Sequence, residues 1–404
     1  MTNPPNDQRN NDPSNNLDLD RIYADIVGLE NRLHFDHAGS SLMPRPVVQC
    51  MVDHLELESR LGGYVAQERK SAALAESYSL IAQLIHAQPS EIAFLPSATD
   101  AWGRAFYSLK LGPGDKVVTA FNEYCSNFVS LLDRQRKSGI EIIVIGPDES
   151  GDLDLAAMEA ALDDRVKVIA ISHVPSSSGQ INPVHEVGRL ARRQQIPFLL
   201  DACQSVGQLP IDVEAIGCDM LTATGRKFLR GPRGCGFLYI RKSLQSRLEP
   251  VMLTNQAALW VSAHSYQLRT DAQVMEAWER NVAAQLGLAE AVRYLLNIGV
   301  EAASDRSQML ARKLRKKLHD LPGIRLTDPG RQHSAIITCQ HDRLSPQEIK
   351  EALEQRNIAV QVASVMHTRL DLEARGIESA LRLSPHYINH DEDIGLLCKA
   401  LAAL

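Results

Sequence analysis

The sequence contains few cysteines, and none of them lies in a pair. Its seven cysteines are scattered over 404 residues, and no two of them form a C-x-x-C motif. An odd, dispersed set of this kind argues against a disulfide framework and against a zinc site. We therefore expect a reducing, cytoplasmic environment and no bound metal.

Long apolar runs and a surplus of basic residues are missing as well. No apolar stretch approaches the roughly 20 residues that a membrane-spanning helix needs. The formal net charge is −6, and an acidic surface does not attract nucleic acid or an anionic membrane. We therefore expect no membrane partner and no nucleic-acid partner.

Large apolar side chains are also scarce at the N-terminus, where Asn, Asp and Pro dominate residues 1–16. Such a segment cannot offset the entropy cost of ordering its backbone. It also lacks the apolar core of a secretory signal. We expect residues 1–19 to form a disordered tail.

What the sequence does contain, from about residue 66 to 260, is an alternation of two hydrophobic periods. Short β-branched runs such as 116–119 and 166–171 are separated by stretches with helical periodicity, such as 71–85 and 184–195. Strands separated by helices predict an α/β fold, with a mainly parallel sheet between two layers of helices. Ligands of such folds bind at the carboxyl ends of the strands.

The pattern changes after about residue 266. We expect a smaller α+β domain there, because the chain is too long for one average core. The predicted elements are helices at 271–296 and 304–321, strands at 335–338 and 359–362, a helix at 346–356 and a last helix from residue 391. The predicted organisation is an N-terminal segment at 20–47 that packs with the small domain, a large domain at 48–264 and a small domain at 265–404.

One lysine and one aspartate indicate the chemistry. Asp201 ends the apolar run 196–201, and Lys227 follows among small residues and glycines. A pyridoxal phosphate (PLP) enzyme needs such a lysine to form a Schiff base, and such a carboxylate to keep the pyridine nitrogen of the cofactor protonated. A lone lysine is more often an ordinary surface residue, so the prediction depends on the features around it.

Four further features lie where a PLP site needs them. Segment 96–100 puts hydroxyl groups at a helix N-terminus, where free amides attract a phosphate, although a simple helix cap is the plainer interpretation. Segment 123–127 carries an aromatic ring that can stack on the cofactor or anchor a surface loop. The serine-rich segment 171–179 can hydrogen-bond the cofactor or the substrate, and its His173 can equally be a core residue. Arg382 offers a bidentate fork for a substrate carboxylate, or a structural salt bridge.

Taken together, the D-x-x-Q motif at 201–204 and the K-x-x-x-G-P-x-G motif that begins at Lys227 resemble the class V aminotransferase group of fold-type I PLP enzymes. That group includes cysteine desulfurases, isopenicillin-N-epimerase-like proteins and C–S lyases. The resemblance covers the chain from His34 to the C-terminal helix. It implies a large domain with a mainly parallel seven-stranded sheet, a smaller α+β C-terminal domain, PLP as the cofactor, an amino acid as the substrate and a homodimer.

The resemblance also implies roles for individual residues. Lys227 would hold PLP covalently, Asp201 would pair with the pyridine nitrogen, and Gln204 would bond the phenolic oxygen. Tyr124 would stack on the ring, where desulfurases have histidine. The other expected contacts are Ser97, Ala98, Thr99 and Thr224 at the phosphate, Ser176 and Arg226 at positions that are asparagine and histidine in desulfurases, and Arg382 at the substrate carboxylate.

One absence bears on the reaction. Desulfurases carry a catalytic cysteine upstream of the carboxylate-binding arginine, and residues 361–381 contain none, so sulfur transfer is disfavoured. Segments 62–68, 226–234 and 276–287 resemble the C–S lyase of ergothioneine biosynthesis, which cleaves hercynylcysteine sulfoxide. We therefore expect β-elimination from a cysteine S-conjugate or sulfoxide, with pyruvate and ammonia as products. An aminotransferase, an epimerase and a PLP-binding protein without turnover stay open as alternatives.

Overall fold

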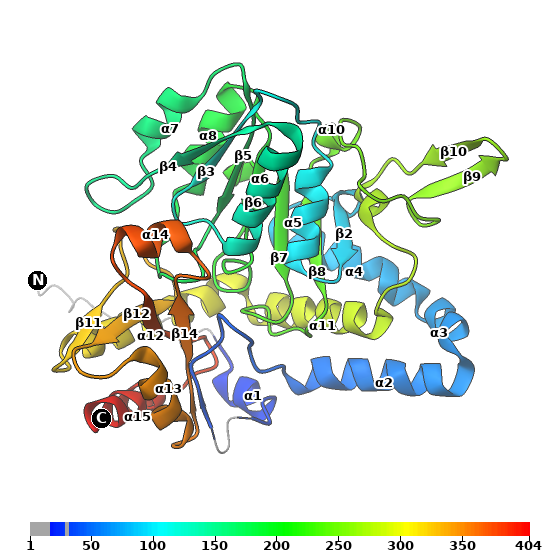
Figure 1. Ribbon diagram of the computed structural model, residues 1–404. Helices are drawn as coiled ribbons and strands as arrows, with labels where there is room; N and C mark the ends of the chain where they lie inside the picture. The colour runs from blue at the N-terminus through cyan, green and yellow to red at the C-terminus, as the bar shows by residue number, and fades with distance from the viewer. Residues whose placement is uncertain (1–16, 29–31) are drawn as a thin grey trace, which may run out of the picture.

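The computed structural model describes residues 17–28 and 32–404 (Figure 1). Most of the predicted tail, residues 1–16, lies outside the described residues. Within the described chain, Leu17 is buried and α1 spans Leu19–Ala24. No helix of this part is both long and apolar enough to cross a membrane.

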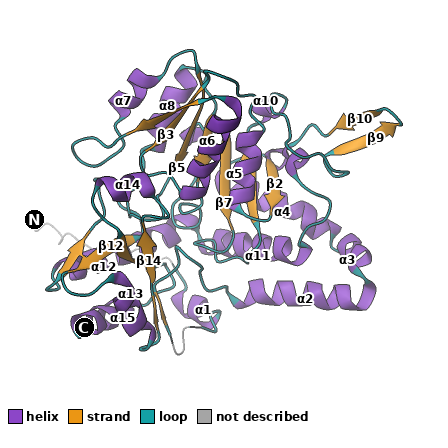
Figure 2. Ribbon diagram, viewed as in Figure 1, coloured by secondary structure: helices purple, strands orange, loops and turns teal. Residues whose placement is uncertain are grey.

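A seven-stranded sheet forms the centre of the larger part of the molecule (Figure 2). Its strands lie in the order β2-β8-β7-β6-β5-β3-β4, and of these seven β8 alone runs in the direction opposite to the other six. The bounds are β2 Ile92–Leu95, β3 Lys116–Ala120, β4 Glu141–Ile145, β5 Val166–Ser172, β6 Phe198–Asp201, β7 Met220–Thr224 and β8 Gly236–Ile240. The prediction of an α/β fold with a mainly parallel seven-stranded sheet is confirmed.

Helices cover both faces of this sheet. They are α4 Ser71–Ile85, α5 Ala98–Tyr107, α6 Cys125–Ser138, α7 Leu155–Ala161, α8 Val184–Arg193 and α11 Val282–Ile298. In β5, Val168 packs in the core with α5 and α6, whereas the next residue, Ile169, packs in the core with α4, α8 and α11. Successive strand side chains point to opposite faces, so strands that are apolar throughout bury two helical layers.

The C-terminal part contains a second, smaller sheet, whose strands are antiparallel and lie in the order β11-β12-β15-β14. The elements are β11 Ile324–Leu326, β12 Ile337–His341, β14 Gln361–Ser364, β15 Ser379–Leu383, α12 Val300–His319, α13 Pro346–Glu354, α14 Arg369–Ala374 and α15 Asp391–Ala402. Leu310, Ile337, Leu381 and Leu397 share one apolar core between this sheet and its helices. An α+β unit therefore follows the large sheet, as predicted.

The predicted long helix at 271–296 is wrong at its start. Residues 272–275 form a 3-10 turn, the backbone is extended at Glu276, and α11 begins only after that. The buried Glu276 carboxylate accepts hydrogen bonds from Tyr78 Oη (2.9 Å) and Phe94 N (2.8 Å). These bonds hold the segment against β2, and a helix there would break them.

The predicted strand at 359–362 is two short strands in different sheets. β13 (Ile358–Ala359) pairs in parallel with β1 (Leu33–His34), and β14 continues in the four-stranded sheet. Directly after β1, Phe35 O accepts a hydrogen bond from Ser384 N (2.7 Å), which follows β15. The N-terminal segment therefore runs beside the end of β15.

Further elements lie away from the two large sheets. α2 (Arg45–Leu61) and α3 (Gly63–Arg69) lead to α4, and α11 packs against α2 and α4. The hairpin of β9 (Ala258–Ser262) and β10 (Ser265–Leu268) projects from the body of the molecule (Figure 1). The remaining short elements are η2 Pro89–Glu91, α9 Val213–Ile216, α10 Lys242–Gln245 and η3 Ala272–Met275. The predicted domain limits stay a prediction.

Candidate active site

One cavity of about 240 Å³ opens at the carboxyl ends of the parallel strands, where ligands of such sheets bind. Of the eleven residues that the sequence assigned to a site, ten line this cavity, and Arg382 does not. The ten are Ser97, Ala98, Thr99, Tyr124, Ser176, Asp201, Gln204, Thr224, Arg226 and Lys227. The fold therefore gathers side chains from segments that are far apart in the sequence.

Lys227 lies in a tight turn after β7. Gly231 N donates to Gly225 O (2.8 Å) and Arg230 N to Lys227 O (2.9 Å), which closes the chain around the lysine. The Lys227 side chain is buried, and its Nζ lies 3.5 Å from Cys203 Sγ. Sequence reasoning missed Cys203, although it stands inside the D-x-x-Q motif.

Asp201 ends β6 and is also buried. Its Oδ1 accepts a hydrogen bond from Cys203 N (2.9 Å), and its Oδ2 accepts one from Asn127 Nδ2 (2.8 Å). Burial raises the pKa of the Asp201 carboxyl, and these hydrogen bonds and the nearby Lys227 oppose the rise. Both oxygens are thus fixed by donors, and the carboxylate lies at the cavity wall.

The start of α5 forms a second side of the cavity. Ser97 caps this helix, since its Oγ accepts from Asp100 N (3.1 Å). The cap does not conflict with a ligand site, because the first amides of a helix, here those of Ala98 and Thr99, have no acceptor within the helix. Such amides and the positive end of the helix dipole suit a phosphate.

Two arginines add positive charge to the same cavity. Arg226, whose Nη1 donates to Gly39 O, and Arg233 both line it. Within residues 17–28 and 32–404, neither guanidinium lies within ion-pair distance of a carboxylate. Together with Lys227, they outweigh the charge of Asp201, which favours an anionic ligand.

Several buried polar atoms in the cavity wall have no hydrogen-bond partner within the described chain. They include Ser176 Oγ and Gln204 Oε1, while Gln204 Nε2 donates to Ala38 O (3.1 Å). Buried polar atoms are rarely left unpaired, so these two atoms have capacity for a ligand. His173, in contrast, is outside the cavity lining, and burial lowers its pKa to about 3, which keeps it neutral.

Arg382 lies on β15, behind the cavity wall. Its Nη1 donates to Ser176 O (3.1 Å), and its Nη2 lies 3.0 Å from Asp36 Oδ1. Both interpretations offered by the sequence therefore stay relevant: Arg382 forms an internal salt bridge and also contacts a residue of the cavity. Asp36, from the N-terminal segment, was missed because nothing in its local sequence indicates this partner.

The chemistry of the donors fits PLP. A buried lysine amine can hold the cofactor aldehyde, a buried carboxylate can face a protonated ring nitrogen, and a cationic helix terminus can hold the phosphate. Tyr124, at the start of α6, adds an aromatic side chain to the wall. In the described chain, no group of three or more His, Cys, Asp or Glu side chains is arranged to hold a metal ion.

Comparisons with known proteins agree with this fit. The model of the aminotransferase class-V family matches residues 33–397, which is most of the chain. A probable cysteine desulfurase of Methanothermobacter thermautotrophicus is 29% identical over 387 residues, covering 94% of this chain and 96% of the relative. A probable cysteine desulfurase of Pyrococcus abyssi is 28% identical over 384 residues, covering 92% and 94%.

Solved structures show the same fold. The cysteine desulfurase of Thermococcus onnurineus has a TM-score of 0.89 and 26% identity, and the match covers 95% of this chain and 97% of that one. A cystine C–S lyase in complex with cysteine persulfide has a TM-score of 0.84 and 20% identity, with 93% and 98% covered. The chain therefore belongs to the aminotransferase class-V family and is a PLP-dependent enzyme of fold type I, similar to cysteine desulfurases.

Proposed function

We propose that this enzyme is a C–S lyase that acts on a cysteine S-conjugate or a cysteine sulfoxide such as hercynylcysteine sulfoxide. The substrate's Cβ–S bond breaks with its electron pair leaving on sulfur, and hydrolysis of the remainder gives pyruvate and ammonia. The observation that carries the proposal is the absence of cysteine from residues 361–381. No thiol stands there to receive sulfur upstream of Arg382.

The proposed elimination needs a base for the substrate's Cα proton and a negative charge beside the ring nitrogen of the cofactor. When bound, PLP supplies a ring that accepts electrons from the substrate's Cα. Lys227 Nζ would hold the cofactor, and its amine would serve as the base for the substrate's Cα proton. The ionised Asp201 carboxylate would pair with the ring nitrogen and favour its protonated form. Lys227 is buried and lines the cavity, so it lies beside the space in which the substrate would bind.

The other cavity residues would hold and orient the cofactor and the substrate. Backbone and hydroxyl groups of Ser97, Ala98, Thr99 and Thr224, with the Arg226 guanidinium, bind the phosphate. Gln204 would bond the phenolic oxygen of the cofactor, Ser176 would contact the cofactor or the substrate, and Tyr124 would stack on the ring. Arg382 binds the substrate carboxylate, which fixes Cα close to Lys227 Nζ. The buried, unpaired Ser176 Oγ and Gln204 Oε1 support these contacts.

The second candidate is cysteine desulfurase, which the names of the relatives favour. A thiol does line the cavity at Cys203. In that reaction the sulfur of free cysteine passes to an enzyme thiol and alanine is released. Aminotransferase and epimerase activities share the removal of the Cα proton and differ only in where a proton returns.

The products separate these candidates. The purified yellow enzyme is incubated with cysteine S-conjugates, cysteine sulfoxides and free cysteine, and pyruvate, alanine and the cofactor spectrum are followed. We expect pyruvate and ammonia in equal amounts, with the cofactor spectrum restored after turnover. Alanine from cysteine, lost in Cys203→Ser, would establish the desulfurase instead. Conversion of the cofactor to its amine form, reversed by a keto acid, would establish an aminotransferase.

We also propose that the enzyme is a cytoplasmic homodimer. All seven cysteines are free thiols, which fits a reducing compartment.

The exposed apolar side chains support the dimer. The projecting hairpin exposes Leu259, Trp260 and Tyr266, and Tyr64 on α3 is 75% exposed. Exposed apolar groups of this size are typical of a subunit interface. Light scattering should give twice the chain mass, and Trp260→Glu should give the monomer; a monomeric wild type would refute the dimer.

A further inference from the structure

A second buried carboxyl group, Glu123, lies directly behind Asp201. It follows β3, and its side chain is 4% exposed. Its Oε1 accepts three hydrogen bonds, from Ser172 Oγ (2.6 Å), Tyr124 N (2.8 Å) and Asn127 Nδ2 (2.9 Å). Its Oε2 is buried and has no partner within the described residues. None of the roles proposed above uses this group.

One amide joins the two carboxyl groups. Asn127 Nδ2 donates to Glu123 Oε1 (2.9 Å) and to Asp201 Oδ2 (2.8 Å). An amide nitrogen carries two protons, so both are used, one for each carboxyl. A shift of Glu123 would therefore disturb Asn127, which holds Oδ2 of Asp201, a residue of the cavity wall.

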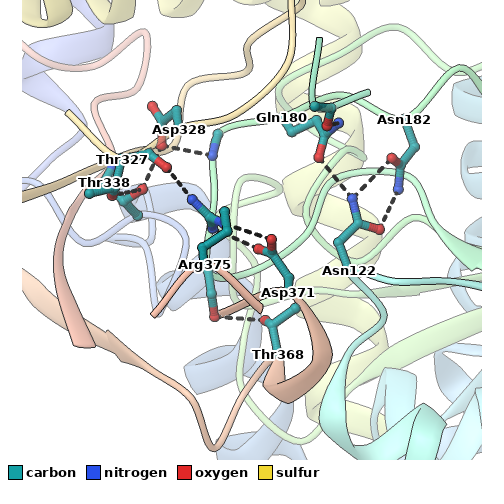
Figure 3. A network of polar contacts seen from close by, with 12 residues as sticks. Asn122, Gln180, Asn182, Thr327, Asp328, Thr338, Thr368, Asp371 and Arg375 are labelled. Atoms are coloured by element: carbon teal, nitrogen blue, oxygen red, sulfur yellow. Dashed lines mark hydrogen bonds and ion pairs between the residues drawn. The ribbon is translucent and has the colours of Figure 1, made fainter. Parts of the chain in front are cut away.

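The residue just before Glu123 belongs to a network of side-chain amides (Figure 3). Its neighbour Asn122 donates to Gln180 Oε1 (2.9 Å) and Asn182 Oδ1 (3.1 Å). Asn182 Nδ2 donates in turn to Ser172 O (2.7 Å), next to the hydroxyl that binds Glu123. This network ties the end of β3 to the end of β5, the same two segments that the hydrogen bond between Ser172 and Glu123 joins.

The protonation state of Glu123 depends on the charges around it. The charged group that faces it is Asp201, from β6, with Lys227 beyond that carboxylate. Two carboxylates in a dry site are costly to ionise together. Burial first, and the Asp201 charge second, raise the pKa of Glu123 to about 7, against its three hydrogen bonds. Burial raises the pKa of Asp201 too, but Asn127, Cys203 N and Lys227 favour its ionised form, so we assign the proton of the pair to Glu123.

We propose that Glu123 is a positioning residue for Asp201, which holds that carboxylate through Asn127 and whose proton sets the negative charge behind the cofactor's ring nitrogen. The inference rests on the proposed role of Asp201 and not on the reaction that follows. Loss of the Glu123 proton adds a charge that favours the protonated ring. PLP binding and Glu123 ionisation therefore strengthen each other.

The test compares wild type with Glu123→Gln, which keeps the shape and the acceptor oxygen but cannot ionise. The PLP dissociation constant is measured by fluorescence at about pH 6 and about pH 8, on either side of the expected titration. The ratio of the constants, Glu123→Gln over wild type, should rise about fivefold or more between the two values. The ratio cancels the titration of Lys227, which both proteins share.

A direct readout identifies the group. Infrared difference spectra of the holoenzyme should show a protonated carboxyl band that disappears as the pH rises through neutrality, and Glu123→Gln should lack it. Ser172→Ala removes a hydrogen bond to the ionised form, so it should move this titration to higher pH. A constant ratio, or an unchanged band in Glu123→Gln, would overturn the proposal. If the Glu123 band titrates in the wild type but the enzyme releases no pyruvate from cysteine S-conjugates or sulfoxides, only the lyase function is refuted.

Discussion

Arg382 Nη2 lies 3.0 Å from Asp36 Oδ1, so the arginine proposed to bind the substrate carboxylate already holds a carboxylate of its own chain. Arg382 also donates to Ser176 O, which belongs to a residue of the cavity wall. The guanidinium is thus held at the small domain and connected to the cavity. A substrate carboxylate must share or replace the contact with Asp36.

Arg382→Gln should raise the KM for the amino-acid substrate, because an amide cannot replace a charged bidentate donor. The loss should be about 1.5–3 kcal/mol, or roughly ten- to a hundredfold. Steady-state kinetics measure it, with Arg369→Gln as a control on exposed α14 that should leave KM unchanged. Asp36→Asn should lower KM by removing the competing charge; a higher KM would mean that Asp36 orients the arginine.

Lys227→Ala should abolish both turnover and the visible absorbance of the covalently held cofactor. The amine is the proposed covalent anchor and base, and loss of a base alone removes about two to four orders of magnitude in rate. Absorption spectra after dialysis and a pyruvate assay check this. Lys167→Ala, at an exposed residue of β5, is the control. A retained absorbance band would assign the anchor to another lysine.

Asp201→Asn should leave the covalent anchor at Lys227 in place, weaken PLP binding and lower kcat by about a hundredfold or more, because the proposed preorganised charge behind the ring is lost. Asp219→Asn is a matched control, since Asp219 caps the opposite end of β6 by accepting from Phe198 N (3.0 Å). It should affect stability and leave kcat unchanged. Equal losses of kcat in both variants would show a merely structural effect.

Tyr78→Phe should destabilise the fold. Tyr78 Oη lies 2.9 and 3.0 Å from the two oxygens of the buried Glu276 carboxylate, which also accepts from Phe94 N. Loss of the hydroxyl leaves a buried charge with one donor fewer, at a cost of about 1.5–3 kcal/mol. Urea unfolding measures it, and Tyr239→Phe, which removes a buried hydroxyl without a hydrogen-bond partner in the described chain, should cost little by comparison.

The enzyme should lose stability as the pH falls below about 6.5, the ordinary pKa of histidine. Burial lowers the pKa of His173 and of His386 to about 3. Between these values the unfolded chain binds protons that the folded chain excludes, so acid favours unfolding by up to about 1.4 kcal/mol per pH unit for each histidine. His386→Gln and His173→Gln should each reduce this slope in urea unfolding; unchanged slopes would place the acid sensitivity elsewhere.

Local patterns were sufficient for the sheet and for the cofactor. The apolar run ending at Asp201 and the turn around Lys227 are continuous in sequence, and together with the other motifs they indicate the chemistry before any tertiary contact is known. The cavity also gathers Ser97 and Thr224, because parallel strands bring their carboxyl ends to one edge.

Only the tertiary structure decided which distant groups meet. Asp36 reaches Arg382 across 346 positions of sequence because the N-terminal segment pairs with β13, which no local pattern indicates. The delayed start of α11 also depends on a distant partner, because the buried Glu276 carboxylate accepts a hydrogen bond from Phe94 N in β2. The sequence by itself thus determined the fold class and the lysine–carboxylate chemistry, which follow from periodicity and residue type. The surroundings of each charge, including Glu123 behind Asp201, depend on burial and on partners that only folding supplies.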